Sequence, residues 1–75
     1  MNVNYLIRNL IEAREVLGEK VFTKAAALIY FNHYIKQMIE RRERLNRSKL
    51  QRQVNLSLRE IGCEEVPYSF FRKLI

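Results

Sequence analysis

The stretch TKAAALIYFNHYI at residues 23–35 decides the fold class of this chain. Apolar residues lie on nearly every side of the helix that it would form, which is typical of a helix covered by other helices. The helix is expected to begin near Val21 or Thr23, with Thr23 as a possible N-cap. The longest apolar run, Ala25 to Phe31, has only seven residues, too few to cross a membrane. We expect this stretch to form the central, most buried helix.

Helical spacing extends in both directions from this stretch. Glycine and proline are scarce, no segment alternates at period two, and apolar residues recur three and four positions apart. Toward the N-terminus this spacing predicts a helix over residues 4–17, and Gly18 suits the left-handed position that follows a helix end. The apolar stripe of that helix consists of Leu6, Leu10, Ala13 and Leu17.

Toward the C-terminus the sequence offers two competing helix starts. Ser48 followed by Gln51 has the pattern of a capping box, which predicts a helix that ends at Gly62, although Ser57 followed by Glu60 offers a competing start. Pro67 suits a first helical position and opens a last helix to residue 75. Whether residues 21–61 form one helix or two stays open. The apolar face after Ser48 consists of Leu50, Val54, Leu58 and Ile61.

These patterns predict an all-α fold, a small bundle of three to four helices with a long central helix, in one domain over residues 1–75. A chain of 75 residues has a small core and usually needs a supplement to it. Cys63 is the only cysteine and His33 the only histidine, so neither a disulfide nor a zinc site is available. We therefore expect a homodimer, with its interface on Leu28, Ile35, Met38 and Ile39.

Basic residues are concentrated in the second half of the chain. Residues 1–35 hold four Lys/Arg and three Glu, whereas residues 36–75 hold ten Lys/Arg and five Glu, which together give the net charge of +6. Such clusters neutralise nucleic-acid phosphates. Alternatively they form a solvated helix face, supported by Glu40 with Arg44 and Glu43 with Arg47. The candidate phosphate contacts are Arg41, Arg42, Arg44, Arg47, Lys49 and Arg52.

Residues 57–75 resemble a helix-turn-helix. Ser-Leu-Arg-Glu-Ile would start its first helix, and the second helix would bury Phe71 and Leu74 while exposing Arg72 and Lys73 to a major groove. The turn, Cys63-Glu64-Glu65, lacks the usual glycine and places two carboxylates near the phosphates. An ordinary helical corner is the alternative interpretation.

The two ends of the chain are similar to the enterobacterial family of small nucleoid modulators, helical proteins that partner larger DNA-organising proteins. The similarity lies in Tyr5-Leu6-Ile7-Arg8 and in Val66-Pro67 followed by Ser69 and an aromatic residue. The middle of the chain lacks that family's acidic residues. The assignment is not adopted.

The leading hypothesis is a small DNA-binding regulator of the phage or plasmid type, with DNA a better partner than RNA and the basic helix supplying affinity. The alternative is an adaptor or inhibitor that docks its basic helix on an acidic protein through the seam of Met38, Ile39 and Leu45. A surface bound to anionic membrane ranks third. We expect no enzyme activity, cofactor or metal, and the lone thiol suggests the cytoplasm.

Overall fold

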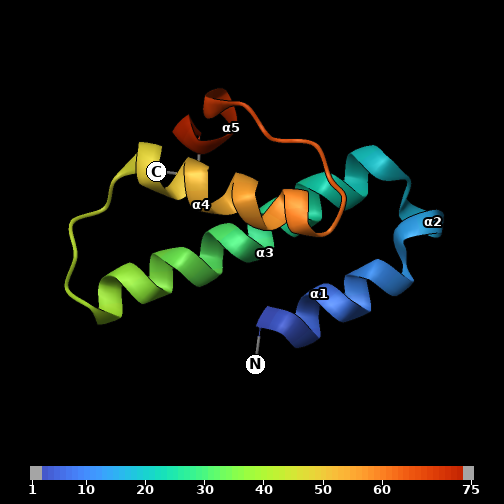
Figure 1. Ribbon diagram of the computed structural model, residues 1–75, viewed down its shortest axis with the longest axis horizontal. Coiled ribbons are helices and arrows are strands. Elements are labelled where there is room, and N and C mark those ends of the chain that lie inside the picture. Colours follow the sequence, from blue (N-terminus) through green and yellow to red (C-terminus); the bar gives the residue numbers. More distant parts are fainter. Residues whose placement is uncertain (1–2, 74–75) are drawn as a thin grey trace.

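The computed structural model describes residues 3–73, and over them the chain is all-helical (Figure 1). The bundle has five helices in this range, more than the three to four expected. Among these residues no helix has the length and apolar content needed to cross a membrane. The helices are α1 (Val3–Glu12), α2 (Arg14–Leu17), α3 (Glu19–Glu40), α4 (Arg47–Glu60) and α5 (Tyr68–Arg72).

The predicted first helix is divided in two. The Ala13 amide donates to the Leu10 carbonyl at 3.0 Å, a tighter turn than the α-helical one, and the chain restarts as the single turn α2. Gly18 then has a φ of +82°, the positive value expected from its position after the helix. This turn brings α2 against the start of α3.

The predicted long central helix is confirmed as α3, which packs against α1, α2 and α4. It begins at Glu19, so the expected start at Val21 or Thr23 is wrong: Gly18 is the N-cap, and Thr23 lies inside the helix. The helix is not covered on all sides, because Leu28 is 46% exposed and Ile39 is 62% exposed. Its buried residues are Phe22, Ala26, Ala27, Phe31 and Met38.

The question of one helix or two over residues 21–61 is answered by a break at residues 41–46, after which α4 runs back along α3 (Figure 1). The side chain of Asn46 caps α4 by accepting from the Lys49 amide at 3.2 Å. The capping box predicted at Ser48 is therefore wrong. Ser48 lies in the first turn of α4, and the competing start at Ser57 lies well inside it.

The buried face of α4 meets α3 and α5. Leu50, Val54 and Leu58 are fully buried, as the spacing predicted, and Phe71 of α5 packs on Phe31 of α3 with ring centroids 5.8 Å apart. Residues 61–67, named here the α4–α5 corner, connect the two helices. Pro67 is the N-cap of α5, one position before the helical start assigned to it. Leu74 and Ile75, also assigned to that helix, lie outside the described residues.

Candidate nucleic-acid interface

The segment from Arg41 to Arg47, named here the basic loop, joins α3 to α4 at one end of the long dimension of the molecule (Figure 1). Arg42 has a φ of +56° and is the only non-glycine residue with positive φ among those described. Its amide donates to Ile39 at 3.1 Å, and the Glu43 amide donates to Met38 at 2.8 Å. These two bonds form the Schellman motif, which ends a helix with a left-handed residue.

Left-handed backbone is costly for arginine, since it brings the Cβ close to the following carbonyl and costs about 1–2 kcal/mol. Glycine or asparagine usually fills this position. Strained residues of this kind often lie at functional sites. The Schellman geometry turns the chain away from α3 and leaves Arg41, Arg42 and Arg44 exposed.

The start of α4 is also cationic. Its first turn carries Arg47 and Lys49 and no acidic residue. The N-terminal end of a helix dipole is positive, so cations there are less favourable than carboxylates by roughly 0.3–1 kcal/mol each. The charges at this end of α4 are therefore unfavourable with respect to the helix dipole. An anion would be favoured there instead.

Few carboxylates compensate the basic loop. Glu43 pairs with Lys49, with Nζ and Oε2 3.2 Å apart, and both side chains are partly exposed. None of the ion pairs resolved within residues 3–73 engages Arg41, Arg42 or Arg44. With Arg47 and Lys49 against Glu40 and Glu43, these three arginines give this end of the molecule an excess of positive charge.

The helix-support interpretation of the basic stretch is wrong in its geometry. That interpretation predicted two ion pairs, Glu40–Arg44 and Glu43–Arg47, each between residues four positions apart on one helix. Because α3 ends at Glu40 and α4 begins at Arg47, neither pair lies within a single helix. The spacing of four therefore gives no i,i+4 stabilisation here.

Arg52 lies apart from the basic loop, more than one turn into α4. It is exposed and lines a shallow depression with Arg59, whose guanidinium is 3.5 Å from the Glu65 carboxylate. The structure therefore brings five of the six candidate cations to the α3–α4 connection. Arg52 stands on the outer face of the helix that leads away from it.

Arg72 and Lys73 belong to another surface. Both are exposed at the end of α5, and Lys73 shares a groove with Lys24 and Leu28 of α3. From Lys24 to Arg41 is about 25 Å along α3, at a rise of about 1.5 Å per residue. The candidate cations thus form a group of five at the α3–α4 connection and a pair at the end of α5, with Arg52 apart from both.

The helix-turn-helix resemblance is not reproduced by the described residues. The connection extends from Ile61 to Pro67, longer than the turn of about three to four residues in that motif, and α5 has only five residues. Leu58 and Phe71 are buried as expected, Val66 is buried as well, Ile61 is half-buried, and Leu74 lies outside the described residues. The pattern describes a helical corner.

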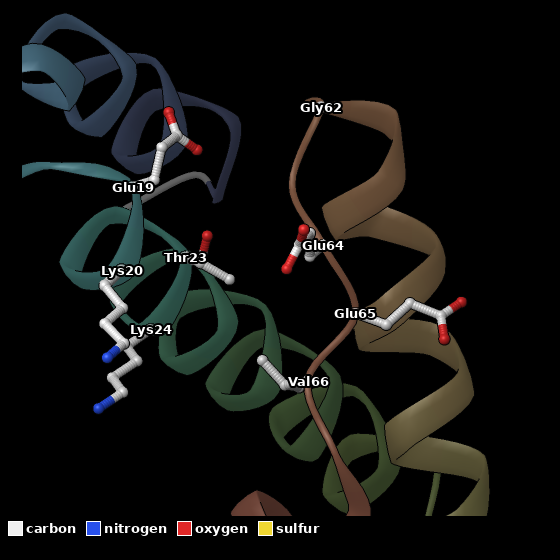
Figure 2. Close-up of a pocket in the computed structure, with 8 residues that line it drawn as sticks. All are labelled: Glu19, Lys20, Thr23, Lys24, Gly62, Glu64, Glu65 and Val66. Carbon is white, nitrogen blue, oxygen red and sulfur yellow. The ribbon is translucent and has the colours of Figure 1, made fainter.

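The α4–α5 corner contains acidic residues. Figure 2 shows Glu64 directed toward Thr23 of α3, while Glu65 extends to the other side of the connection. Glu19 lies at the start of α3 on the same pocket. Lys20 and Lys24 line the same pocket, and Arg14 and Arg59 pair with Glu19 and Glu65. The corner, at the opposite end of the α3–α4 pair from the basic loop (Figure 1), therefore has mixed charge and no excess of cations like that of the loop.

Arg14, which the sequence interpretation did not single out, fixes this corner. It donates to the carbonyls of Ile61 and Gly62 at 3.2 and 3.3 Å, and its guanidinium lies 4.6 Å from the ring centroid of Phe22. It also binds Glu19 through two nitrogens, at 2.6 and 2.9 Å, and these bonds lower the pKa of that carboxyl. Local spacing in the sequence does not predict the contacts of Arg14 with Ile61 and Gly62, which lie 47 and 48 residues away.

The residues expected at a dimer interface do not share one exposed face. Met38 is only 3% exposed and belongs to the core of the single chain. Leu28 and Ile39 are exposed, and Ile35 between them is half-buried. The surface that remains for a partner consists of Leu28, Ile35 and Ile39.

No protein-family model, curated protein or solved structure matches this chain.

Proposed function

We propose that this protein binds nucleic acid through the basic loop. The observation that carries the proposal is the α3–α4 connection itself, where arginines on a strained turn meet a helix start that lacks acidic residues. Guanidinium groups and helix N-termini are both common phosphate ligands. Their combination at one end of the molecule gives phosphates a site that helix stability does not explain.

Duplex DNA is the partner that best fits the loop. Single-stranded RNA is usually held by aromatic side chains on which bases stack, and residues 41–47 contain no aromatic residue. The loop offers charge to the backbone, which supplies affinity without reading sequence. A regulator of the phage or plasmid type would also need a second surface that recognises the DNA sequence.

A homodimer is the second part of the proposal. The exposed side chains of Leu28 and Ile39, with Ile35 between them, form an apolar stripe on α3. Covering it with a second copy would remove apolar surface from water and double the number of basic loops on one DNA. Sedimentation at micromolar concentration tests this, and a monodisperse monomer would refute it.

The test of DNA binding is a salt series. Each phosphate contact contributes about 0.9 to the slope of log affinity against log salt, so Arg41→Ala with Arg44→Ala should lower its magnitude by nearly two. A matched control, Arg8→Ala with Lys20→Ala, removes two exposed charges outside the loop and should leave the slope unchanged.

Two results would overturn the proposal. One is an unchanged slope in the Arg41/Arg44 variant. The other is loss of binding on charge reversal of Arg72 and Lys73 alone, which would move the interface to α5.

An acidic protein is the alternative partner for the same loop. Ile39 and Leu45, at 62% and 44% exposed, lie beside the arginines and give the surface an apolar component. The third member of that seam, Met38, is buried and cannot contribute. Binding that survives Ile39→Ser with Leu45→Ser would favour DNA over a protein partner.

A further inference from the structure

A second surface with its own chemistry lies between α3 and α5, well away from the basic loop. Its walls are Leu28 of α3, Val66 and Pro67 of the connection, and Phe70 of α5, and we name it the α3–α5 groove. Lys24, Ser69 and Lys73 also line it. The groove is open to solvent and has a volume of about 460 Å³.

The floor of the groove is apolar and accessible. Leu28 is 46% exposed, Pro67 is exposed and Phe70 is half-buried, so a partner could remove this surface from water. Phe70 also packs edge-on against the buried Phe71, with ring centroids 5.3 Å apart, which fixes its position. The floor is therefore a preformed hydrophobic surface and not a loose side-chain cluster.

The rim of the groove is cationic. Lys24 and Lys73 line it together with no carboxylate, and Arg72 joins Lys73 in the adjoining depression. Lys24 also lines the neighbouring pocket with Glu19, Glu64 and Glu65, and in Figure 2 its side chain extends away from Glu64. A partner with apolar side chains flanked by negative charges would complement the apolar floor and the positive rim.

We propose that the α3–α5 groove docks an acidic amphipathic helix of another protein, with leucine-type side chains on Leu28 and Phe70 and carboxylates on Lys24 and Lys73. A helix fits this mode because side chains spaced three and four apart enter such a groove. The part of the chain that the structure describes has no strand edge on which an extended peptide could pair. Within residues 3–73 no helix is strongly acidic, so the partner is not a second copy.

Nucleic acid is the less suitable occupant. The lysines would suit phosphates, but Phe70 is the one aromatic side chain among the lining residues, and its ring is half-buried and packed edge-on against Phe71, so bases would find little surface for stacking. The proposal does not depend on DNA binding by the basic loop. The groove and the basic loop have separate variants and separate probes. Leu28 also belongs to the proposed dimer stripe, so a second copy and the acidic helix would compete for it.

The test uses the full chain and a fluorescein-labelled helical peptide of about 18 residues, long enough to form helix in isolation. Its leucines are spaced three and four apart and flanked by glutamates, and a scrambled peptide of the same composition is the control. Amide chemical shifts of the ¹⁵N-labelled protein should move at Leu28, Val66 and Phe70. The shifts of Arg41 and Arg44 should stay in place.

Charge reversal then separates specific docking from general attraction. Lys24→Glu with Lys73→Glu should weaken the peptide by at least about tenfold, since like charges meet across the rim. Lys20→Glu with Lys36→Glu makes the same change in net charge outside the groove and should weaken it far less. Circular dichroism checks that both variants remain folded.

Three outcomes would overturn the proposal. The scrambled peptide might bind equally, the groove variant might bind as tightly as its control, or a short DNA duplex might shift the groove residues and displace the peptide. The last outcome would identify the groove as a nucleic-acid surface. Loss of DNA binding in the Arg41/Arg44 variant leaves this test unaffected.

Discussion

The two ends of the α3–α4 pair are built on the same backbone motif and held in different ways. After α3, Arg42 takes the left-handed position and Glu43 bonds back to Met38 at 2.8 Å. After α4, Gly62 takes that position with a φ of +78°, and Cys63 bonds back to Leu58 at 2.9 Å. Both are Schellman motifs.

The difference lies in the side chains that surround each turn. At the α4–α5 corner, Asn55 receives the Val66 amide at 2.8 Å and donates to its carbonyl at 3.2 Å, and Cys63 and Val66 are buried. The basic loop has the Asn46 cap and the surface pair Glu43–Lys49, and all its residues are exposed. Tertiary contacts therefore hold the α4–α5 corner, whereas the cations of the basic loop are exposed to solvent.

The largest effect should come from breaking the corner at Asn55. Asn55→Ala leaves the buried amide and carbonyl of Val66 unpaired, and each unsatisfied group costs about 1–3 kcal/mol. The matched change at the basic loop, Asn46→Ala, removes one exposed cap bond worth about 1 kcal/mol. Urea unfolding should rank Asn55→Ala as the more destabilising, and equal losses would contradict the contrast between the turns.

Exchanging the residues at the left-handed positions should shift stability in opposite directions. Gly62→Ala should destabilise by about 1–2 kcal/mol because alanine at positive φ is strained. Its added Cβ would meet only Arg14 Nη1 at 3.9 Å, an ordinary contact, so the backbone sets the cost.

Arg42→Gly relieves the same strain at the basic loop. Glycine loses more chain entropy on folding, so the net gain should be about 0.5–1 kcal/mol. Thermal melts of both variants measure the two signs. A destabilised Arg42→Gly protein would show that the arginine makes contacts that offset its strain.

These two turns also show what the sequence could predict. Gly62 was expected as a helix end because glycine is the residue that tolerates positive φ, and Leu50, Val54 and Leu58 followed from helical spacing. Arg42 carries no such signal, and the apolar residues Met38, Ile39 and Leu45 continue helical spacing across the break. Helical spacing therefore left open whether residues 21–61 form one helix or two, and it could not place the end of α3.

The candidate site, like the helix ends, could be predicted only as far as local sequence patterns determine it. The basic cluster is visible as composition, but its division into a loop and an α5 group depends on which helices pack together. Lys24 joins Lys73, and Arg14 joins Ile61, only through tertiary structure. Local spacing contains no information on such pairs.

Arg42→Gly also separates function from fold. If Arg42 contacts a phosphate, the variant should bind DNA with a salt slope smaller by about 0.9 while melting at a higher temperature. Gly62→Ala should lower the melting temperature and leave the slope unchanged. A stabilised variant with an unchanged slope would mean that Arg42 shapes the loop without contacting DNA.

The smallest effect should be the pH dependence of the corner held by Arg14. The side-chain hydrogen bonds of Arg14 lower the pKa of Glu19, so the folded protein binds that proton less readily than the unfolded chain. The resulting stability is complete above the unfolded glutamate pKa of about 4.3 and is lost as the pH falls through the lower folded pKa. Glu19→Gln removes this dependence, so the wild type and the variant should differ less in melting temperature once the pH is below the folded pKa of Glu19.

Glu15→Gln is the control, because it removes a carboxylate from α2 without changing the hydrogen bonds of Arg14. The difference in melting temperature between Glu15→Gln and the wild type should not shrink in this way at acidic pH. If Glu19→Gln differs from the wild type equally at neutral and acidic pH, the carboxylate does not contribute through its charge, and the Ile61 and Gly62 carbonyls and Phe22 hold Arg14 in place without it.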